Sequence, residues 1–235
     1  MKWSEITTSI ADLFMPRHCA VCSRVLNYGE EHICVECLTD VPLTRLHRVK
    51  FNTVEQLFAG KVPVERASGI FYYSKNSPYD NILYDTKYHN VPDLARYVAQ
   101  TFSLELADDG FFTGIDAIVP IPLHRLKHAA RGYNQSEHVA RGFSNTSGIP
   151  VLNAIVATRE HSTQTRKGAF ERWQNTRDIF ALAPGAAEAI EGKHILVVDD
   201  VITTGATIES AISTMLPVPG TRFSVLTLAV AHHYW

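Results

Sequence analysis

Long hydrophobic segments are absent from this 235-residue sequence. No run of about 18 apolar residues occurs, so no transmembrane helix and no membrane insertion are predicted. Charge of one sign is not in excess, because the formal net charge is −2, and this excludes a chain kept unfolded by self-repulsion. The 13 Gly and 11 Pro follow no period, which excludes a collagen-like or low-complexity chain. The 46% of hydrophobic residues predicts a globular protein with one good core and room for a small appendage.

Residues 1–15 lack the features of a secretory signal peptide. They carry Glu5 and Asp12, and no compact apolar block precedes a small-residue cleavage site. Trp3 and Ile10 fall on one side of a helical projection, which predicts a short amphipathic helix. We therefore expect a cytoplasmic protein.

Cysteine is scarce, and its four copies are confined to one short segment. They form two C-x-x-C pairs eleven residues apart, at Cys19, Cys22, Cys34 and Cys37. Each pair can supply two thiolates to one tetrahedral ion, and residues 1–45 are too short to bury a core of their own, so a structural zinc is predicted to hold this segment together. Two disulfides, redox chemistry and an iron–sulfur centre are the alternatives.

Strands alternate with helices through the rest of the chain. Strands are expected at residues 67–73, 115–119, 151–156, 179–182, 195–198 and 222–231, and helices at 80–88, 92–106, 134–146 and 207–216. This alternation predicts an α/β domain with a parallel sheet over residues 67–235. Residues 46–66 are expected to connect it to the cysteine segment.

Residues 195–207, ILVVDDVITTGAT, are the most informative stretch. Four apolar residues predict a buried parallel strand, and Asp199 and Asp200 follow at its carboxyl end, where ligands bind in open α/β sheets. The small, hydroxylated residues 203–207 lead into a helix, and their backbone N–H groups can form an anion-binding nest. Gly205 lets the backbone approach a phosphate, and the two carboxylates can accept hydrogen bonds from ribose hydroxyls. The alternative is an ordinary strand end followed by a helix cap. Neither a Walker loop nor a G-x-G-x-x-G motif is present.

This stretch resembles the phosphoribosyl pyrophosphate (PRPP) signature of type I phosphoribosyltransferases. Residues 120–123 (PIPL) and 131–136 (RGYNQS) are similar to the PIPL…RG[FY]NQ pattern of the ComF family. Lys87-Tyr88 stands where that family has its KY or KF pair, and LFMPRHCAVC with CVEC downstream resembles its four-cysteine knuckle.

The resemblance implies the fold class and the roles of individual residues. It implies an α/β fold of the type I phosphoribosyltransferase kind, a parallel sheet flanked by helices, with a small N-terminal zinc-binding domain. Asp199, Asp200 and Arg131 are the implied catalytic candidates, and a mobile loop is implied at residues 124–134. Magnesium is expected to accompany the pyrophosphate. The implied PRPP-binding residues are Asp199, Asp200, Val201, Thr203, Thr204, Gly205, Ala206, Thr207, Lys87 and Arg125.

Basic residues concentrate in the middle of the chain. Residues 121–177 hold nine Lys or Arg against three Glu, although the whole chain is slightly acidic. Within them, cations alternate with Phe170 and Trp173, a composition that suits single-stranded nucleic acid. The candidate nucleic-acid residues are Arg159, Arg166, Lys167 and Arg172. A surface helix with both aromatic rings in the core is the alternative.

The resemblance gives the functional hypothesis. A ComF-family protein is expected to bind PRPP or a related ribose phosphate, to serve DNA uptake in natural transformation, and to handle single-stranded DNA beside proteins of the uptake machinery. The alternative is an active phosphoribosyltransferase of nucleotide salvage, which transfers a pentosyl group from PRPP to a nucleophile.

Overall fold

A four-stranded parallel sheet organises the chain. The computed structural model describes residues 16–88, 91–158 and 179–231. The strand order is β1 (Ala67–Tyr73), β6 (Arg222–Ala231), β5 (His194–Ile202) and β2 (Ala117–Pro120), and each neighbouring pair is parallel. The strands are apolar and buried over most of their length, as a sheet covered on both faces requires. The predicted fold class is confirmed.

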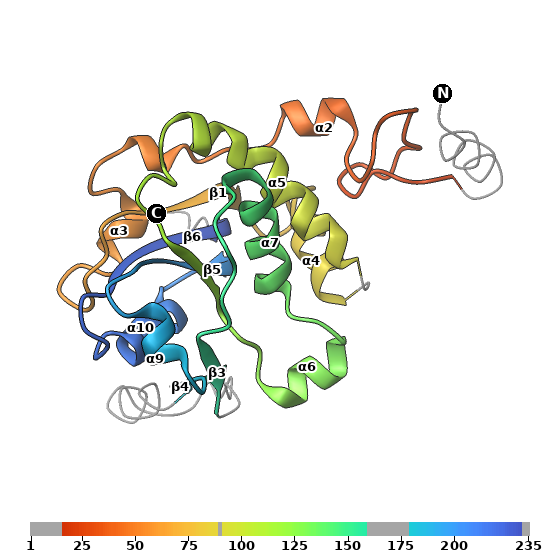
Figure 1. Ribbon diagram of the computed structural model, residues 1–235. Helices are drawn as coiled ribbons and strands as arrows, with labels where there is room; N and C mark the ends of the chain where they lie inside the picture. The colour runs from red at the N-terminus through yellow and green to blue at the C-terminus, as the bar shows by residue number, and fades with distance from the viewer. Residues whose placement is uncertain (1–15, 89–90, 159–178, 232–235) are drawn as a thin grey trace.

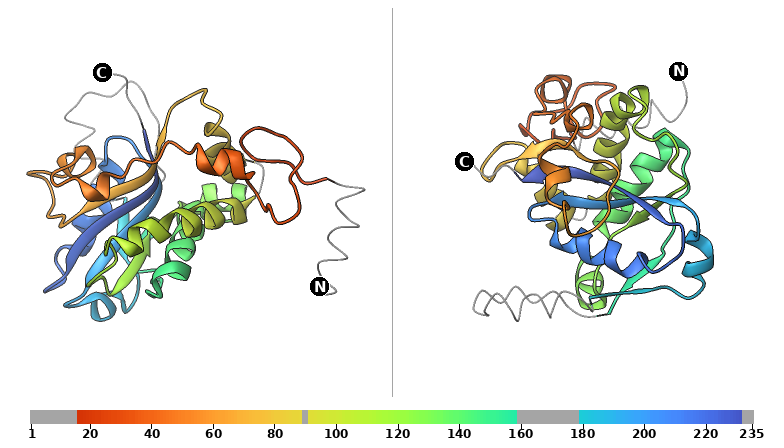
Figure 2. Two further views of the ribbon diagram at one scale, coloured as in Figure 1. Left: turned by 90° about the horizontal axis from the view of Figure 1, so that it is seen from above. Right: turned by 90° about the vertical axis from the view of Figure 1, so that its left-hand side faces the viewer.

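Helices cover both faces of this sheet, and each side has its own apolar core. The helices α4 (Asp80–Tyr88), α5 (Pro92–Asp108) and α7 (Gln135–Ser147) pack on one face. The helices α9 (Ala186–Ile190) and α10 (Ala206–Met215) pack on the other (Figure 2).

Glycine sets the closeness of α5 and α7. A Cβ on Gly142 of α7 would lie 2.5 Å from the carbonyl oxygen of Arg96 and 2.6 Å from the Cβ of Ala99, both on α5. Only hydrogen in place of a side chain lets the two backbones approach so closely. This contact sets the spacing of α5 and α7 on that face of the sheet.

Two smaller elements flank the carboxyl ends of the strands. An antiparallel pair, β3 (Ile155–Ala157) and β4 (Phe180–Leu182), contacts α10. Helix α6 (Arg125–Arg131) extends from the end of β2 (Figure 1). Residues 125–131 are thus helical where the resemblance implied a loop, and α6 has no buried residue, so no apolar periodicity marks it in the sequence.

The cysteine segment packs on the helices of the first face. Its short helix α2 (Val35–Thr39) follows Cys34, and the segment contributes Val21, Leu26 and Ile33 to the core that α4 and α5 share. The hydroxyl of Tyr79 donates to the carbonyl oxygen of Cys37 at 3.0 Å.

Residues 46–66, expected to be a connector, carry the one-turn helices η1 (Leu46–Arg48) and α3 (Thr53–Gln56). Leu46, Val54 and Phe58 enter the core on the α10 face. The predicted helix at residues 1–15 lies outside the described residues. Within the described chain, every helix is too short or too polar to cross a membrane.

Candidate functional site

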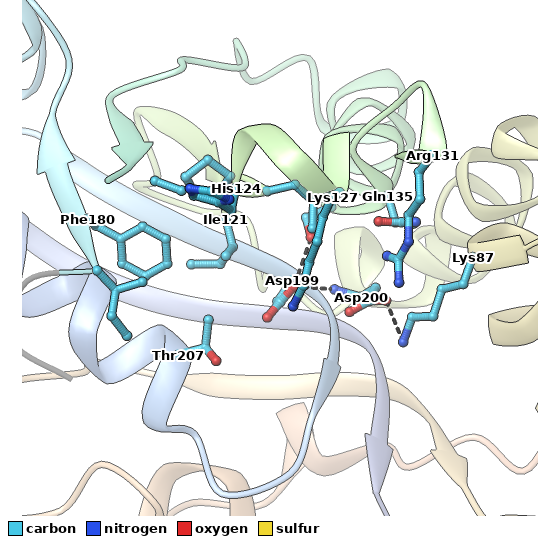
Figure 3. A pocket seen from close by; sticks show the side chains of 15 residues that line it. Lys87, Ile121, His124, Lys127, Arg131, Gln135, Phe180, Asp199, Asp200 and Thr207 are labelled. Carbon is cyan, nitrogen blue, oxygen red and sulfur yellow. Dashed lines mark hydrogen bonds and ion pairs between the residues drawn. The ribbon is translucent and has the colours of Figure 1, made fainter. Parts of the chain in front are cut away.

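A cavity of about 180 Å³ opens where β2 and β5 end and α7 begins. Part of its wall carries charged and polar groups, and part carries apolar side chains from the residues that follow β2 and from the β3–β4 pair (Figure 3). Its position matches the carboxyl edge of the sheet, where open α/β folds bind ligands. The lining residues are Lys87, Ile121, Pro122, Leu123, His124, Lys127, Arg131, Gln135, Ser136, Ala157, Ile179, Phe180, Asp199, Asp200 and Thr207.

The two predicted acids stand side by side in this cavity. The hydroxyl of Ser136 donates to Asp199 Oδ1 at 2.8 Å, and the amide of Asp200 donates to the same oxygen at 2.9 Å. Lys87 Nζ lies 2.8 Å from Asp200 Oδ2, and both side chains are largely buried. The acids remain in β5, because Asp199 pairs with Thr227 of β6. Both carboxylates are therefore fixed in direction before any ligand binds.

The surroundings shift the pKa values of this cluster. Burial, and next the charge of Asp200, raise the pKa of Asp199 to about 7, although the Ser136 hydrogen bond opposes the shift. Burial lowers the pKa of Lys87, but the attraction of Asp200 and Asp199 outweighs this effect, so its net pKa is raised. The lysine therefore stays charged, while the buried Asp199 carboxyl can carry a proton near neutrality.

The turn after β5 offers free backbone donors. Within the described chain, the amides of Thr203, Thr204 and Gly205 donate to no other residue, and α10 begins directly behind them with its own unpaired N–H groups. Gly205 has φ +77°, and a Cβ there would lie 3.2 Å from the ring of Phe58. A second cavity, of about 30 Å³, is lined by residues 201–208 and Asp199. This arrangement can hold one phosphate-sized anion.

Cations reach the larger cavity from α4 and α6. Lys127 and Arg131 of α6 line it together with Lys87, and Figure 3 shows Lys127 pointing from α6 toward Asp199. Arg125, which the resemblance placed at the PRPP site, is exposed at the start of α6 and is not among the lining residues. The helical spacing of α6 turns Lys127 and Arg131, rather than Arg125, toward the acids.

The RGYNQS motif, residues 131–136, makes hydrogen bonds that connect the elements around the cavity. The hydroxyl of Tyr133 donates to the carbonyl oxygen of Thr86 at 2.6 Å, next to Lys87. Asn134 Nδ2 donates to the carbonyl oxygen of Ile121, and Asn134 Oδ1 accepts from the amide of Ser136. No role for Ser136 in the site was predicted from the sequence. Its position in this motif was the only indication that the sequence offered.

The four cysteines form a separate cluster. Their sulfurs all lie within 4.8 Å of one another, and Cys22 Sγ and Cys34 Sγ are 3.8 Å apart. Two sulfurs at about 2.3 Å from a tetrahedral zinc are separated by about this distance. The amides of Val21 and Cys34 donate to Cys19 Sγ, each at 3.4 Å. The donor set therefore fits one metal ion.

The thiols of this cluster differ in their acidity. Burial opposes the ionisation of Cys19, but amide hydrogen bonds, first those of Cys22 and Cys34, outweigh it and lower the pKa of this thiol to about 7. Burial and neighbouring thiols raise the pKa of Cys37.

The four candidate nucleic-acid residues, Arg159, Arg166, Lys167 and Arg172, lie outside the described residues.

Comparison with known proteins defines the class first. Residues 95–235, more than half of the chain, match the family model of the phosphoribosyl transferase domain. The chain is thus a member of the phosphoribosyltransferase-domain proteins. Competence protein F of Haemophilus influenzae is 31% identical over 192 residues, which are 81% of this chain and 75% of that protein. The chain belongs to the ComF family.

Two further relatives agree with this assignment. DNA utilization protein YhgH of Escherichia coli K12 is 27% identical over 194 residues, covering 81% of this chain and 80% of that protein. Competence protein ComFC of Bacillus subtilis is 30% identical over 118 residues, covering 50% of this chain and 43% of that protein.

Replacement of Asp199 by Asn tests the raised pKa. An unfolded aspartate titrates near pH 4, whereas the folded Asp199 titrates at about 7. Between these values the folded state holds the extra proton, so wild-type stability falls as pH rises. Asp199→Asn removes this dependence, and we expect its stability relative to wild type to increase from pH 4 to 7, by at most about 1.4 kcal/mol per pH unit, and then to level off.

Urea unfolding between pH 4 and 8.5 measures this difference. Asp108→Asn, at an exposed position of α5, is the matched control and should track wild type. A difference between Asp199→Asn and wild type that does not change with pH contradicts the pKa assignment.

Proposed function

We propose that this ComF-family chain binds PRPP in the cavity at the ends of β2 and β5, and that it acts in DNA uptake. The observation that carries the proposal is the pairing of two fixed carboxylates with a turn whose amides are unpaired. The acids suit the vicinal hydroxyls of a ribose, and the turn suits a phosphate attached to it. The names of the relatives, competence protein and DNA utilization protein, support the role in uptake.

The site residues divide into three groups by chemistry. Asp199 and Asp200 accept the ribose hydroxyls, and residues 203–207, with the backbone of Val201 leading into them, hold the 5′-phosphate. Lys87, Lys127 and Arg131 face the pyrophosphate, and Arg131 is also the candidate catalytic residue. Arg125, exposed at the start of α6, would contact PRPP from outside the cavity lining. Magnesium bound with the pyrophosphate would neutralise part of its charge. Pentosyl transfer in nucleotide salvage has less support, because the relatives compared above carry names from competence and DNA utilization.

We also propose three units along the chain. Residues 1–45 form a zinc-binding unit, residues 46–66 a connector that packs under the sheet, and residues 67–235 the phosphoribosyltransferase-like domain. The four clustered sulfurs fit one metal ion, and cysteine pairs that bind metal are typical of reducing compartments, which supports a cytoplasmic location.

Removal of both carboxylate charges tests the PRPP site. Asp199→Asn combined with Asp200→Asn keeps the shape of the site but loses the charged acceptors for the ribose hydroxyls. Calorimetric titration with magnesium and PRPP should give a measurable Kd for wild type and no binding for the double variant. Asp108→Asn with Glu188→Gln removes the same charge from exposed positions and should bind as wild type does. Undiminished affinity in the Asp199/Asp200 variant contradicts the assignment.

Loss of one thiol tests the zinc proposal. Cys34 is fully buried at the centre of the cluster, so Cys34→Ser should reduce the zinc content from one ion per chain to nearly none. Unfolding should then begin in the cysteine segment at a lower temperature, because metal binding contributes folding free energy there. Elemental analysis and thermal denaturation measure both effects. Tyr28→Ser, at an exposed position of the same segment, should retain the metal. A wild-type protein in which elemental analysis finds no zinc would overturn the proposal.

Binding of single-stranded DNA is the part of the proposal that rests on sequence. Arg166→Ala with Lys167→Ala should weaken a gel shift with single-stranded oligonucleotide at least severalfold at physiological salt, and affinity should fall steeply as salt rises. Lys50→Ala with Lys75→Ala removes equal charge from exposed positions elsewhere and serves as the control. Equal weakening in both double variants would show a general charge effect and no DNA site at residues 166 and 167.

A further inference from the structure

One side-chain amide of the cavity wall is buried without a partner. Gln135 is the first residue of α7, it is 2% exposed, and it lines the larger cavity. Its Nε2 finds no acceptor within the described chain. Figure 3 shows it between Lys127 and Arg131. A buried donor in this state lowers the stability of the free protein, so a group that supplies an acceptor would be bound favourably.

The residues on either side of Gln135 do not share this state, whereas His138 Nδ1, one turn further along α7, is also unpaired but does not line the cavity. Asn134 donates to Ile121, and Ser136 donates to Asp199. Asn52, in the other core, donates to three carbonyl oxygens. Buried amides of this protein thus do find partners, and Gln135 differs from them in lining a cavity that a ligand can enter.

The surroundings of Gln135 indicate which acceptor it would meet. Lys127 and Arg131 line the same cavity, and the positive end of the 13-residue helix α7 lies at Gln135 itself. All of these groups favour an oxygen that carries negative charge. The turn at residues 203–207 offers a second anion site, and Asp199 lines the cavities of both. Thr207 also lines both cavities, so the two anion sites adjoin at Asp199 and Thr207.

We infer that Gln135 Nε2 donates a hydrogen bond to the phosphate group at C1 of the bound sugar, and not to the 5′-phosphate. This inference rests on the proposed PRPP site. Gln135 would make the protein distinguish a sugar with two separated phosphate groups from a sugar with one. As a neutral donor, it adds direction to the attraction that Lys127 and Arg131 supply.

Three probes and one substitution test the inference. PRPP, inorganic pyrophosphate and ribose 5-phosphate are titrated calorimetrically, each with magnesium, into wild type and Gln135→Met, which keeps the length of the side chain. We expect Gln135→Met to weaken PRPP and pyrophosphate about tenfold or more, and to leave ribose 5-phosphate within twofold. The melting temperature of the free protein should stay equal or rise, because an unpaired buried amide has been removed.

The remaining outcomes are decisive. Gln56→Met, at an exposed glutamine whose amide is already paired with Phe51, should leave all three affinities unchanged. Equal weakening of all three probes by Gln135→Met, or a lower melting temperature with unchanged affinities, would show a packing role and overturn the inference alone. A wild-type protein that binds none of the probes would overturn the proposed function and this inference with it.

Discussion

Two neighbouring carboxylates at the buried end of β5 create the requirement that the rest of the site meets. Acids this close repel each other, and burial removes the water that would screen them. The structure answers with Lys87 from α4, 2.8 Å from Asp200, and with a hydroxyl from Ser136 on α7. Tyr133 then ties the turn before α7 to the end of α4. The positions of both helices at the sheet edge are thus linked to the charge of these two acids.

Much of the fold could be predicted because burial leaves a regular pattern in the sequence. The strands β1 and β6 and the helix α4 have the predicted bounds, and the two strands are recognisable because each is a near-continuous buried run, as a sheet covered on both faces requires. Helix α6 was missed because nothing on it is buried, and Leu126 is 63% exposed. The connector helix α3 begins with a capping box between Asn52 and Glu55, a local signal that was present in the sequence. The end of β5 was placed too early, because pairing with β6 keeps the acids in the strand.

The parts of the site that lie close together along the chain were the ones the sequence could indicate. The acids and the turn at residues 203–207 are consecutive, and strand, turn and helix follow one another without a long loop. The partners of these residues come from other elements. Ser136 is 63 residues from Asp199 along the chain, and only the packing of α7 against the sheet brings the two together. Arg125 and Lys127 both carry a positive charge, and the rotation of α6 about its axis decides which of them faces the cavity.

The contacts made by Gly205 and Asp200 determine how much of the chain is needed to keep the site together. The ring of Phe58 lies against the turn at Gly205, and Lys87 of α4 pairs with Asp200. Both residues, and the edge strand β1, precede residue 95, where the phosphoribosyl transferase domain match begins. A fragment cut at that boundary would keep the acids and the turn at residues 203–207. It would lose Lys87, which pairs with Asp200, and Phe58, which lies against Gly205. The piece recognisable by homology is therefore smaller than the piece that keeps the whole site together.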